Sequence, residues 1–397
     1  KIQIIFGLLG GLAVFIYGMN MMSECLQKAA GDKMKSILAL LTKNPLLGVL
    51  AGALTTAVLQ SSSATTVMAI GFVSAGLMNL PQAISIIFGA NIGTTMTAQI
   101  IAFKISDYIY VIIFIGFLIS FVTKSEKVKS IGQTIFAFGL LFLGIETMGD
   151  VMKPLASSPV FTDLIGRVAH IPVLGVAVGT VMTLVVQSSS ATIAVLQNFA
   201  SQPGPDGVTS ILGLAGAIPI LLGDNIGTTI TALLASIGQS KDAKRTAVAH
   251  CIFNISGCFL FIWFVKPFAA LIQNISPKGP EIEAISRQIA NAHTVFNITM
   301  TLIWVCLIKL MVKIVMTLIP DGKKGVEDPG SPIYLDENII SQPAAALQLV
   351  AKEIFRMSDQ VRDILKKTIE LVKNEEVKSI DGLKENGEQV ERLGKCI

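Results

Sequence analysis

Two matching runs of polar residues stand out in a chain that is otherwise strongly apolar. Gln60-Ser61-Ser62-Ser63 is followed by Ala64-Thr65-Thr66, and the pattern returns in Gln187-Ser188-Ser189-Ser190, followed by Ala191-Thr192-Ile193. Hydroxyl and amide side chains are costly in hydrocarbon unless they have partners. A chain that places the same polar run twice in apolar surroundings is therefore expected to build one binding site from two halves.

The two copies agree well beyond these polar runs. The first is preceded by a proline, two glycines and a threonine that recur before the second at the same offset: Pro45, Gly48, Gly52 and Thr56, then Pro172, Gly175, Gly179 and Thr183. Downstream, Gly89-Ala90-Asn91-Ile92-Gly93-Thr94-Thr95 matches Gly223-Asp224-Asn225-Ile226-Gly227-Thr228-Thr229. The repeat is far longer than the roughly 20–50 residues of solenoid units. It fits a membrane protein built from two duplicated halves.

The residue types in these runs suit an anion and a cation together. A helix that begins inside a membrane presents free N–H groups, which bind anions with the help of the helix dipole. The candidate ligands of a tetrahedral oxyanion are Gln60, Ser61, Ser62, Ser63, Gln187, Ser188, Ser189, Ser190, Asn91 and Asn225. Threonine and aspartate oxygens suit a hard cation such as sodium. The candidate sodium ligands are Asp224, Thr65, Thr94, Thr95, Thr192, Thr228 and Thr229, and no cofactor besides sodium is expected.

Purely structural interpretations stand beside these assignments. The hydroxyls are also suited to bonding neighbouring backbone in a kinked hairpin, and Asp224 is placed to cap a helix that starts near Ile226. The glycine pairs Gly48/Gly52 and Gly175/Gly179 favour helix packing. His250 and His293 occupy similar settings, four residues before an asparagine, and suit either a proton relay or a buried histidine bonded to a neighbouring helix.

Composition places the chain in a membrane. Of its 397 residues 52% are hydrophobic and 15% are charged, with a mean hydropathy of +0.67, whereas soluble domains carry about 25% charged residues. The small net charge of +4 gives no reason to expect a nucleic-acid partner. The five cysteines show no paired spacing, so neither a disulfide framework nor a zinc site is expected.

The apolar segments predict an all-α integral membrane protein. From Pro45 to Gln60 a helix rises only about 22 Å, short of the roughly 30 Å hydrocarbon core, and the run after Ala64 is equally short. We therefore expect re-entrant hairpins turning at residues 60–63 and 187–190, and helices broken at residues 89–93 and 223–225. The other expected helices are 2–26, 81–103, 108–122, 132–148, 211–237, 246–265 and 289–319.

Positive charge predicts how the chain is oriented. Lysine and arginine clusters at residues 28–43, 124–129, 241–245 and 309–324 are expected in the cytoplasm. Loops near 104–107, 150–170 and 266–287 are expected outside. Each repeat then crosses the inner membrane a net odd number of times, so the repeats are inverted and the polar turns approach each other from opposite sides.

The sequence divides into five parts: repeat one (1–130), repeat two (131–270), a final transmembrane region (271–320), a linker (321–343) and a cytoplasmic helical tail (344–397). The tail is amphipathic, with apolar residues at helical spacing from Leu347 to Val372. Two helices form a poor core alone. The tail is thus expected to belong to a larger helical domain, or to pack on a regulatory partner or a second copy.

In its repeated motifs the chain resembles the type II sodium–phosphate cotransporter family, in its bacterial form. The doubled Gln-Ser-Ser-Ser turns, the doubled Gly-x-Asn-Ile-Gly-Thr-Thr elements and His250 with Asn254 carry the resemblance, over about residues 4–318. It implies uptake of inorganic phosphate driven by the sodium gradient, with residues 60–63 and 187–190 lining the site. Residues 331–336 and the helix after Pro343 are similar to the start of a PhoU-like regulatory domain. The large cysteine-bearing external loop of the animal relatives is absent from this sequence.

Two other classes compete with a sodium–phosphate importer that works by alternating access. A channel would use the Asn-Ile-Gly-Thr-Thr carbonyls as a filter. An intramembrane serine hydrolase would need a base beside one serine, and neither His250 nor His293 sits in a recognisable nucleophile motif. Duplicated serines suit a symmetric binding site better than a single nucleophile, so no enzyme is expected.

Overall fold

The computed structural model describes residues 2–30, 44–74, 78–103, 105–156, 166–204, 206–321, 330–335, 343–373 and 380–396. Within these ranges the chain is helical, and the only β contact is an isolated bridge between Pro203 and Ser210. Six of the described helices are long and apolar enough to cross a membrane. The prediction of an all-α, multi-pass membrane protein is therefore confirmed.

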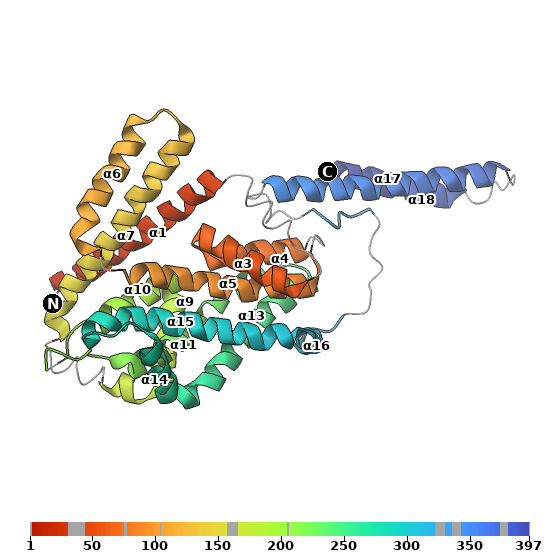
Figure 1. Cartoon of the computed structure of the whole chain (residues 1–397). Coiled ribbons are helices and arrows are strands. Elements are labelled where there is room, and N and C mark those ends of the chain that lie inside the picture. Colours follow the sequence, from red (N-terminus) through yellow and green to blue (C-terminus); the bar gives the residue numbers. More distant parts are fainter. Residues whose placement is uncertain are drawn as a thin grey trace.

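The helices follow the order of the two predicted repeats (Figure 1). Repeat one holds α1 (Ile2–Ala30), α3 (Pro45–Leu59), α4 (Ser62–Ser74), α5 (Leu80–Ile101), η1 (Ser106–Tyr108) and α6 (Ile109–Val122). Repeat two, predicted over 131–270, holds all but the first turn of α7 (Glu126–Ala156), followed by α9 (Pro172–Val186), α10 (Ser189–Ala200), α11 (Gly213–Gly227), α12 (Thr229–Ala235) and α13 (Lys241–Phe261). Then come η2 (Ile262–Phe264), α14 (Val265–Ile275), α15 (Glu281–Cys306), α16 (Ile308–Leu318), α17 (Pro343–Lys373) and α18 (Ile380–Cys396).

Both predicted turns lie where the sequence puts them. α3 ends and α4 begins around Gln60, and α9 ends and α10 begins around Gln187. The two glutamines have φ angles of 52° and 53°, and no other non-glycine residue in the described chain has a positive φ. This left-handed conformation is uncommon outside glycine. Its occurrence at equivalent positions shows that the two hairpins share one backbone design.

Close glycine contacts hold each hairpin against the helix that follows it. A Cβ on Gly52 of α3 would lie 2.1 Å from the carbonyl oxygen of Ile86 in α5, and one on Gly179 of α9 would lie 1.9 Å from that of Ile220 in α11. Small residues let membrane helices approach this closely. The prediction that these glycines serve packing is confirmed.

The predicted helix break in repeat one is wrong. α5 runs without interruption through residues 89–93. Its glycines face α3, where a Cβ on Gly89 would lie 1.9 Å from the carbonyl oxygen of Val49. They are therefore present for close packing and do not interrupt the helix.

In repeat two the helix also continues through residues 223–225. α11 ends only at Gly227, and Thr228, with φ −58° and ψ −26°, keeps a helical backbone before α12. Asp224 thus lies inside a helix. The alternative prediction, that Asp224 caps a helix starting near Ile226, is wrong.

The two hairpins open toward opposite ends of α5. At the start of α5, the backbone N–H of Ser240 donates to Ser74 Oγ (3.1 Å), which places the end of α4 beside the start of α13. Residues of these two helices share a core cluster with Ala83 and Ile86 of α5. The end of α5 lies beside the start of α15, because Arg287 Nη1 donates to the Gln99 carbonyl (3.1 Å).

The end of α10 lies at that second end, where Gln197 Nε2 donates to the Ser286 carbonyl (2.9 Å). The 22 residues of α5 separate the two ends by about 33 Å. This geometry agrees with inverted repeats. The position of the hairpins relative to a bilayer stays a prediction.

An ionic cluster ties α13 to the end of α16. Arg245, which is 4% exposed, donates to the Ile319 carbonyl (2.9 and 2.7 Å) and pairs with Asp242 (2.7 Å) and Asp321 (2.6 Å). The hydrogen bond and charge of Arg245 hold the pKa of the Asp321 carboxyl below its usual range. The basic start of α13 and the end of α16 therefore lie at the same end of the molecule.

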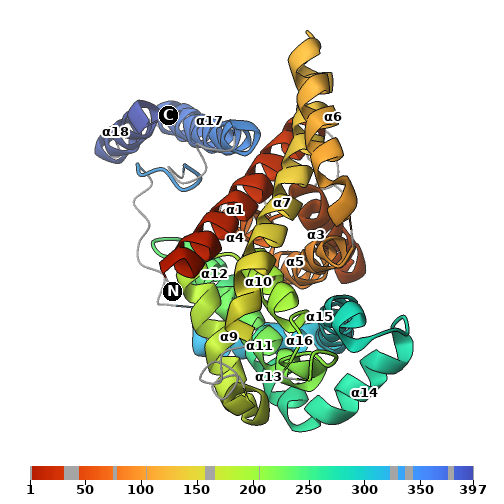
Figure 2. The same cartoon turned by 90° about the vertical axis from the view of Figure 1, so that its left-hand side faces the viewer.

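The tail helices α17 and α18 lie side by side, apart from the apolar helices in both views (Figures 1 and 2). Glu353 is fully buried and accepts hydrogen bonds from the backbone N–H groups of Ile333 and Tyr334 (2.9 and 2.6 Å). Most of the predicted linker, the lysines at 33, 35 and 43, and part of the 150–170 loop lie outside the described residues. The PhoU-like assignment stays a prediction.

Candidate functional site

The first polar turn combines a bonded glutamine with the start of a helix. Gln60 Nε2 donates to the Ala57 carbonyl (2.6 Å), and its Oε1 accepts from Thr97 Oγ1 of α5 (3.1 Å). Ser61 Oγ accepts the N–H of Ala64 (3.2 Å), as a helix-capping residue does. Ser62, 8% exposed, and Ser63 begin α4, where backbone N–H groups have no partner within the helix. This turn offers donors to an anion.

The second turn reproduces this arrangement. Ser188 Oγ caps α10 by accepting the N–H of Ala191 (3.2 Å). Ser189, 9% exposed, and Ser190 occupy the first positions of α10. The turns differ at their glutamines, because Gln187 is exposed and Gln60 is half-buried. Within the described residues, no hydrogen bond joins one turn to the other, so their meeting around a single ion stays a prediction.

A buried threonine pair lies behind each turn. Thr56 and Thr65 place their Oγ1 atoms 2.8 Å apart, and Thr183 and Thr192 place theirs 2.9 Å apart. In repeat two, Thr183 Oγ1 also lies 2.7 Å from Asp224 Oδ1. A hydroxyl donates one proton, so Thr183 donates to the carboxylate and accepts from Thr192. The sequence analysis did not name Thr183 as a candidate site residue, although its match with Thr56 in repeat one could have indicated such a role.

Asp224 is the chemically distinctive group of this region. It is 0% exposed, and its Oδ2 has no hydrogen-bond partner among the described residues. A carboxylate in low dielectric is strongly disfavoured unless a charge or hydrogen bonds compensate it. One oxygen of Asp224 is satisfied by Thr183, and the other is left for a cation or a proton.

The two histidines join the asparagines of the repeats. His250 Nε2 lies 3.1 Å from Asn91 Oδ1, and His293 Nε2 lies 3.3 Å from Asn225 Oδ1. Both histidines are at most 2% exposed. This confirms the prediction of buried histidines bonded to neighbouring helices. The sequence reading missed that each histidine meets the asparagine of one repeat.

Asn91 and Asn225 therefore lie at contacts between helices, and among the described residues no hydrogen bond joins either side chain to a polar turn. Their assignment to phosphate stays a prediction. The remaining candidate sodium ligands donate their hydroxyl protons to their own helices: Thr94 to Ala90, Thr95 to Ile92, Thr228 to Asp224 and Thr229 to Ile226, at 2.7–3.1 Å. Such bonds satisfy the hydroxyl proton and leave oxygen lone pairs for a cation.

Two apolar repeats, each with a hairpin and a polar turn, define a membrane transport protein. The chain belongs to the Na+/Pi-cotransporter family, whose model matches it twice, over residues 14–150 and 144–276. It is thus a member of a phosphate transporter family and not of an enzyme family. The family named in the sequence analysis is confirmed.

Several relatives share this similarity. The chain is 35% identical to the uncharacterized protein YqeW of Bacillus subtilis, over 66% of this chain and 83% of that protein. It is 25% identical to the putative inorganic phosphate export protein YjbB of Salmonella typhimurium, over 90% of this chain and 63% of that protein. A shorter stretch, 34% of this chain and 19% of the relative, is 33% identical to the human sodium-dependent phosphate transport protein 2B. No solved structure matches the chain.

Proposed function

We propose that this protein is a sodium-coupled transporter that imports inorganic phosphate across the inner membrane by alternating access. The observation that carries the proposal is the pair of Gln-Ser-Ser-Ser turns, each with a left-handed glutamine and a helix start beside it. Helix N-termini bind tetrahedral oxyanions through N–H groups and the dipole. Serine hydroxyls add donors that rotate to fit such an anion.

Sodium is assigned to the region behind the second turn. The unpartnered oxygen of Asp224, together with Thr183 and Thr192, offers a negative charge and hydroxyl oxygens to a hard cation. Phosphate carries negative charge, so a nearby carboxylate repels it unless a cation lies between them. Binding of sodium would therefore favour binding of phosphate, which is the coupling that a symporter needs.

The opposed hairpins supply the two gates of this proposal. Hairpin α3–α4 opens at the end of the molecule that carries Lys241 and Arg245, which we assign to the cytoplasm. Hairpin α9–α10 opens at the other end, beside the start of α15. Rocking of one repeat against the other would expose the polar turns to each side in turn. The tail is placed in the cytoplasm, outside the transport path.

Export is a second candidate direction, because a relative that spans 90% of this chain is named a putative inorganic phosphate export protein. The same polar turns would serve either direction. An exporter must expel phosphate while sodium moves inward, whereas an importer moves both ions together. The direction of phosphate transport therefore depends on how phosphate movement is coupled to sodium movement, which flux measurements resolve.

The test is flux of labelled phosphate in liposomes that contain the purified full chain. An inward sodium gradient, against a choline control, is expected to drive saturable accumulation of phosphate. Sodium-driven loss of preloaded phosphate would support export instead. A flux that does not saturate and ignores sodium would contradict both, and would favour the channel alternative.

A further inference from the structure

The chain bends at the end of its last long apolar helix. α15 ends at Cys306, and α16 (Ile308–Leu318) follows after Leu307, which has a φ of −102° and a ψ of 20°. Figure 1 shows α16 close to end-on, beside α15, which runs across the view. The 11 residues of α16 span about 16 Å, roughly half of the 30 Å hydrocarbon core. α16 therefore does not continue α15 across a membrane.

Both ends of α16 lie at the same end of the bundle. α15 starts beside the end of α5 and runs back along it to Phe88, whose carbonyl accepts from Thr301 Oγ1 (3.3 Å). α16 thus begins on the side where α5 starts. Its other end is held there as well, because Arg245 of α13 donates to the Ile319 carbonyl (2.9 and 2.7 Å). A helix placed in this way crosses the end of the bundle, where the membrane boundary is expected.

One side of α16 packs on the bundle, and the neighbouring side is apolar and exposed. Met311 and Val315 are fully buried in the hydrophobic core. Leu310 and Leu318 lie about two turns apart on one face and are 46% and 61% exposed. Large apolar side chains on the surface of a membrane protein are suited to contact lipid acyl chains. This leucine pair therefore offers an apolar surface beside the bundle.

A pair of lysines lies next to the leucines. Lys309 and Lys313 are exposed and share a face of α16, because they are four residues apart. Each residue turns the helix by about 100°, so the leucines stand between the buried side and the lysines. This order, from core through apolar surface to positive charge, matches the order of protein, acyl chains and headgroups at a membrane boundary. Interfacial helices carry lysine on the polar face in the same way.

The charge at this end of the bundle is positive. Residues 236–245 and 307–321 contain four lysines, one arginine and two aspartates. Both aspartates pair with Arg245 (2.7 and 2.6 Å), and within the described part of the chain neither Lys309 nor Lys313 forms an ion pair. Their charges are therefore available to an anion outside the protein.

We propose that α16 binds an anionic phospholipid, with Lys309 and Lys313 at the headgroup phosphate and the leucine pair along the acyl chains. A free phosphate ion would use the lysines alone, whereas a phospholipid uses both surfaces. Lysines near the membrane surface attract anionic lipids. The bound lipid holds α16 at the boundary, where the chain leaves the apolar helices toward the tail. The proposed lipid binding is independent of the ion that drives transport and of the direction of transport.

The test is binding of labelled dioleoylphosphatidylglycerol to the purified full chain in a neutral detergent, with labelled dioleoylphosphatidylcholine as the zwitterionic comparison. We expect saturable binding of phosphatidylglycerol that is tighter than binding of phosphatidylcholine and that weakens as salt is added. Lys309→Gln/Lys313→Gln should weaken one class of bound phosphatidylglycerol about tenfold or more, because two favourable charges are lost. Lys309→Arg/Lys313→Arg keeps both charges and should bind as the wild type does.

The matched control is Lys366→Gln/Lys367→Gln, which removes two exposed charges from α17, a helix that lies apart from the apolar helices (Figures 1 and 2). This variant should bind phosphatidylglycerol as the wild type does. Melting temperature without added lipid verifies that each variant is folded, and Lys313→Gln alone replaces the double variant if the latter does not fold.

Three results would overturn the lipid site. The first is wild-type affinity for phosphatidylglycerol in the folded lysine variant, and the second is equal affinity of the wild type for the two lipids. The third is complete displacement of the lipid by inorganic phosphate at millimolar concentration, which would show that the lysines bind a free anion.

Discussion

The two hairpins of this protein share a backbone and differ in charge. Gln60 and Gln187 adopt the same left-handed conformation, and the threonine pairs behind them are spaced alike, at 2.8 and 2.9 Å. The following helix presents Ala90 in repeat one and Asp224 in repeat two. The two copies therefore share the polar turn, and only the second carries a carboxylate at this position.

This difference separates binding of the anion from binding of the cation, which two identical repeats would share equally. The serines of both turns are equivalent and suit the anion. The cation is expected at repeat two, because only there does a buried carboxylate with an unpartnered oxygen lie behind the turn. The following predictions ask where the repeats behave alike and where they differ.

The largest expected effect is a loss of folded protein, caused by substitution of the glycines that pack alike in both repeats. Gly52→Ala and Gly179→Ala would force a Cβ to within 2.1 and 1.9 Å of a carbonyl oxygen. Overpacking of this kind costs about 1–3 kcal/mol or more, and here backbone must move. Both variants should lose most of the monodisperse protein after purification. Gly10→Ala, where a Cβ meets nothing within 4 Å, should purify normally, and equal yields of all three would contradict the packing account.

The next effect concerns the serines at the two turns. Ser62→Ala and Ser189→Ala each remove a donor from a helix start, and a hydrogen bond to a charged group is worth about 1.5–3 kcal/mol. Apparent phosphate affinity in liposome uptake should fall about tenfold or more in both. Thr147→Ala is the control, because that exposed hydroxyl bonds only its own helix, at the Leu143 carbonyl. Unchanged phosphate affinity in both serine variants would refute the assignment of the turns.

The smallest effect should reveal a second asymmetry. His250→Ala leaves Asn91 without a partner, whereas after His293→Ala the oxygen of Asn225 still accepts from Asn297 (3.4 Å). An unsatisfied buried group costs about 1–3 kcal/mol. His250→Ala should therefore lower the melting temperature more than His293→Ala, and the exposed His170→Ala should change it little. A larger loss for His293→Ala would contradict this difference.

The sequence predicted the parts of the fold that depend on local chemistry. The turns at Gln60 and Gln187 follow from polar residues between two short apolar segments, and the glycine contacts follow from spacing of four residues. The predicted breaks near Asn91 and Asn225 failed, because glycine permits both a break and close packing. Only the neighbouring helix, such as α3 against Gly89, decides between them.

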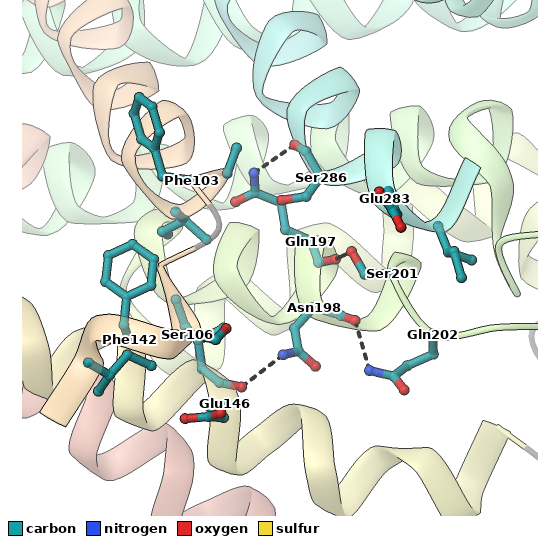
Figure 3. A pocket seen from close by; sticks show the side chains of 15 residues that line it. Phe103, Ser106, Phe142, Glu146, Gln197, Asn198, Ser201, Gln202, Glu283 and Ser286 are labelled. Carbon is teal, nitrogen blue, oxygen red and sulfur yellow. Dashed lines mark hydrogen bonds between the residues drawn. The ribbon is translucent and has the colours of Figure 1, made fainter. Parts of the chain in front are cut away.

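Contacts between helices that are distant in the chain could not be predicted from the sequence. Asp224 was read as either a cation ligand or a helix cap, and its position inside α11 excludes the cap. Its hydrogen bond to Thr183 joins helices 41 residues apart in the chain. A cavity lined by Gln197 of α10 and by residues of α5, α6, α7 and α15 (Figure 3) is a further example, because nothing local to any one of these helices indicates it.

The most direct test of the difference between the repeats is Asp224→Asn in proteoliposomes, with sodium dependence and charge moved per phosphate measured together. Asparagine keeps an oxygen for Thr183 and removes the charge, so the fold should survive. We predict that the apparent sodium affinity falls about tenfold or more, as expected for the loss of a charged ligand, and that the charge moved per phosphate changes. Wild-type values for both quantities in the folded variant would contradict the assignment of sodium to repeat two.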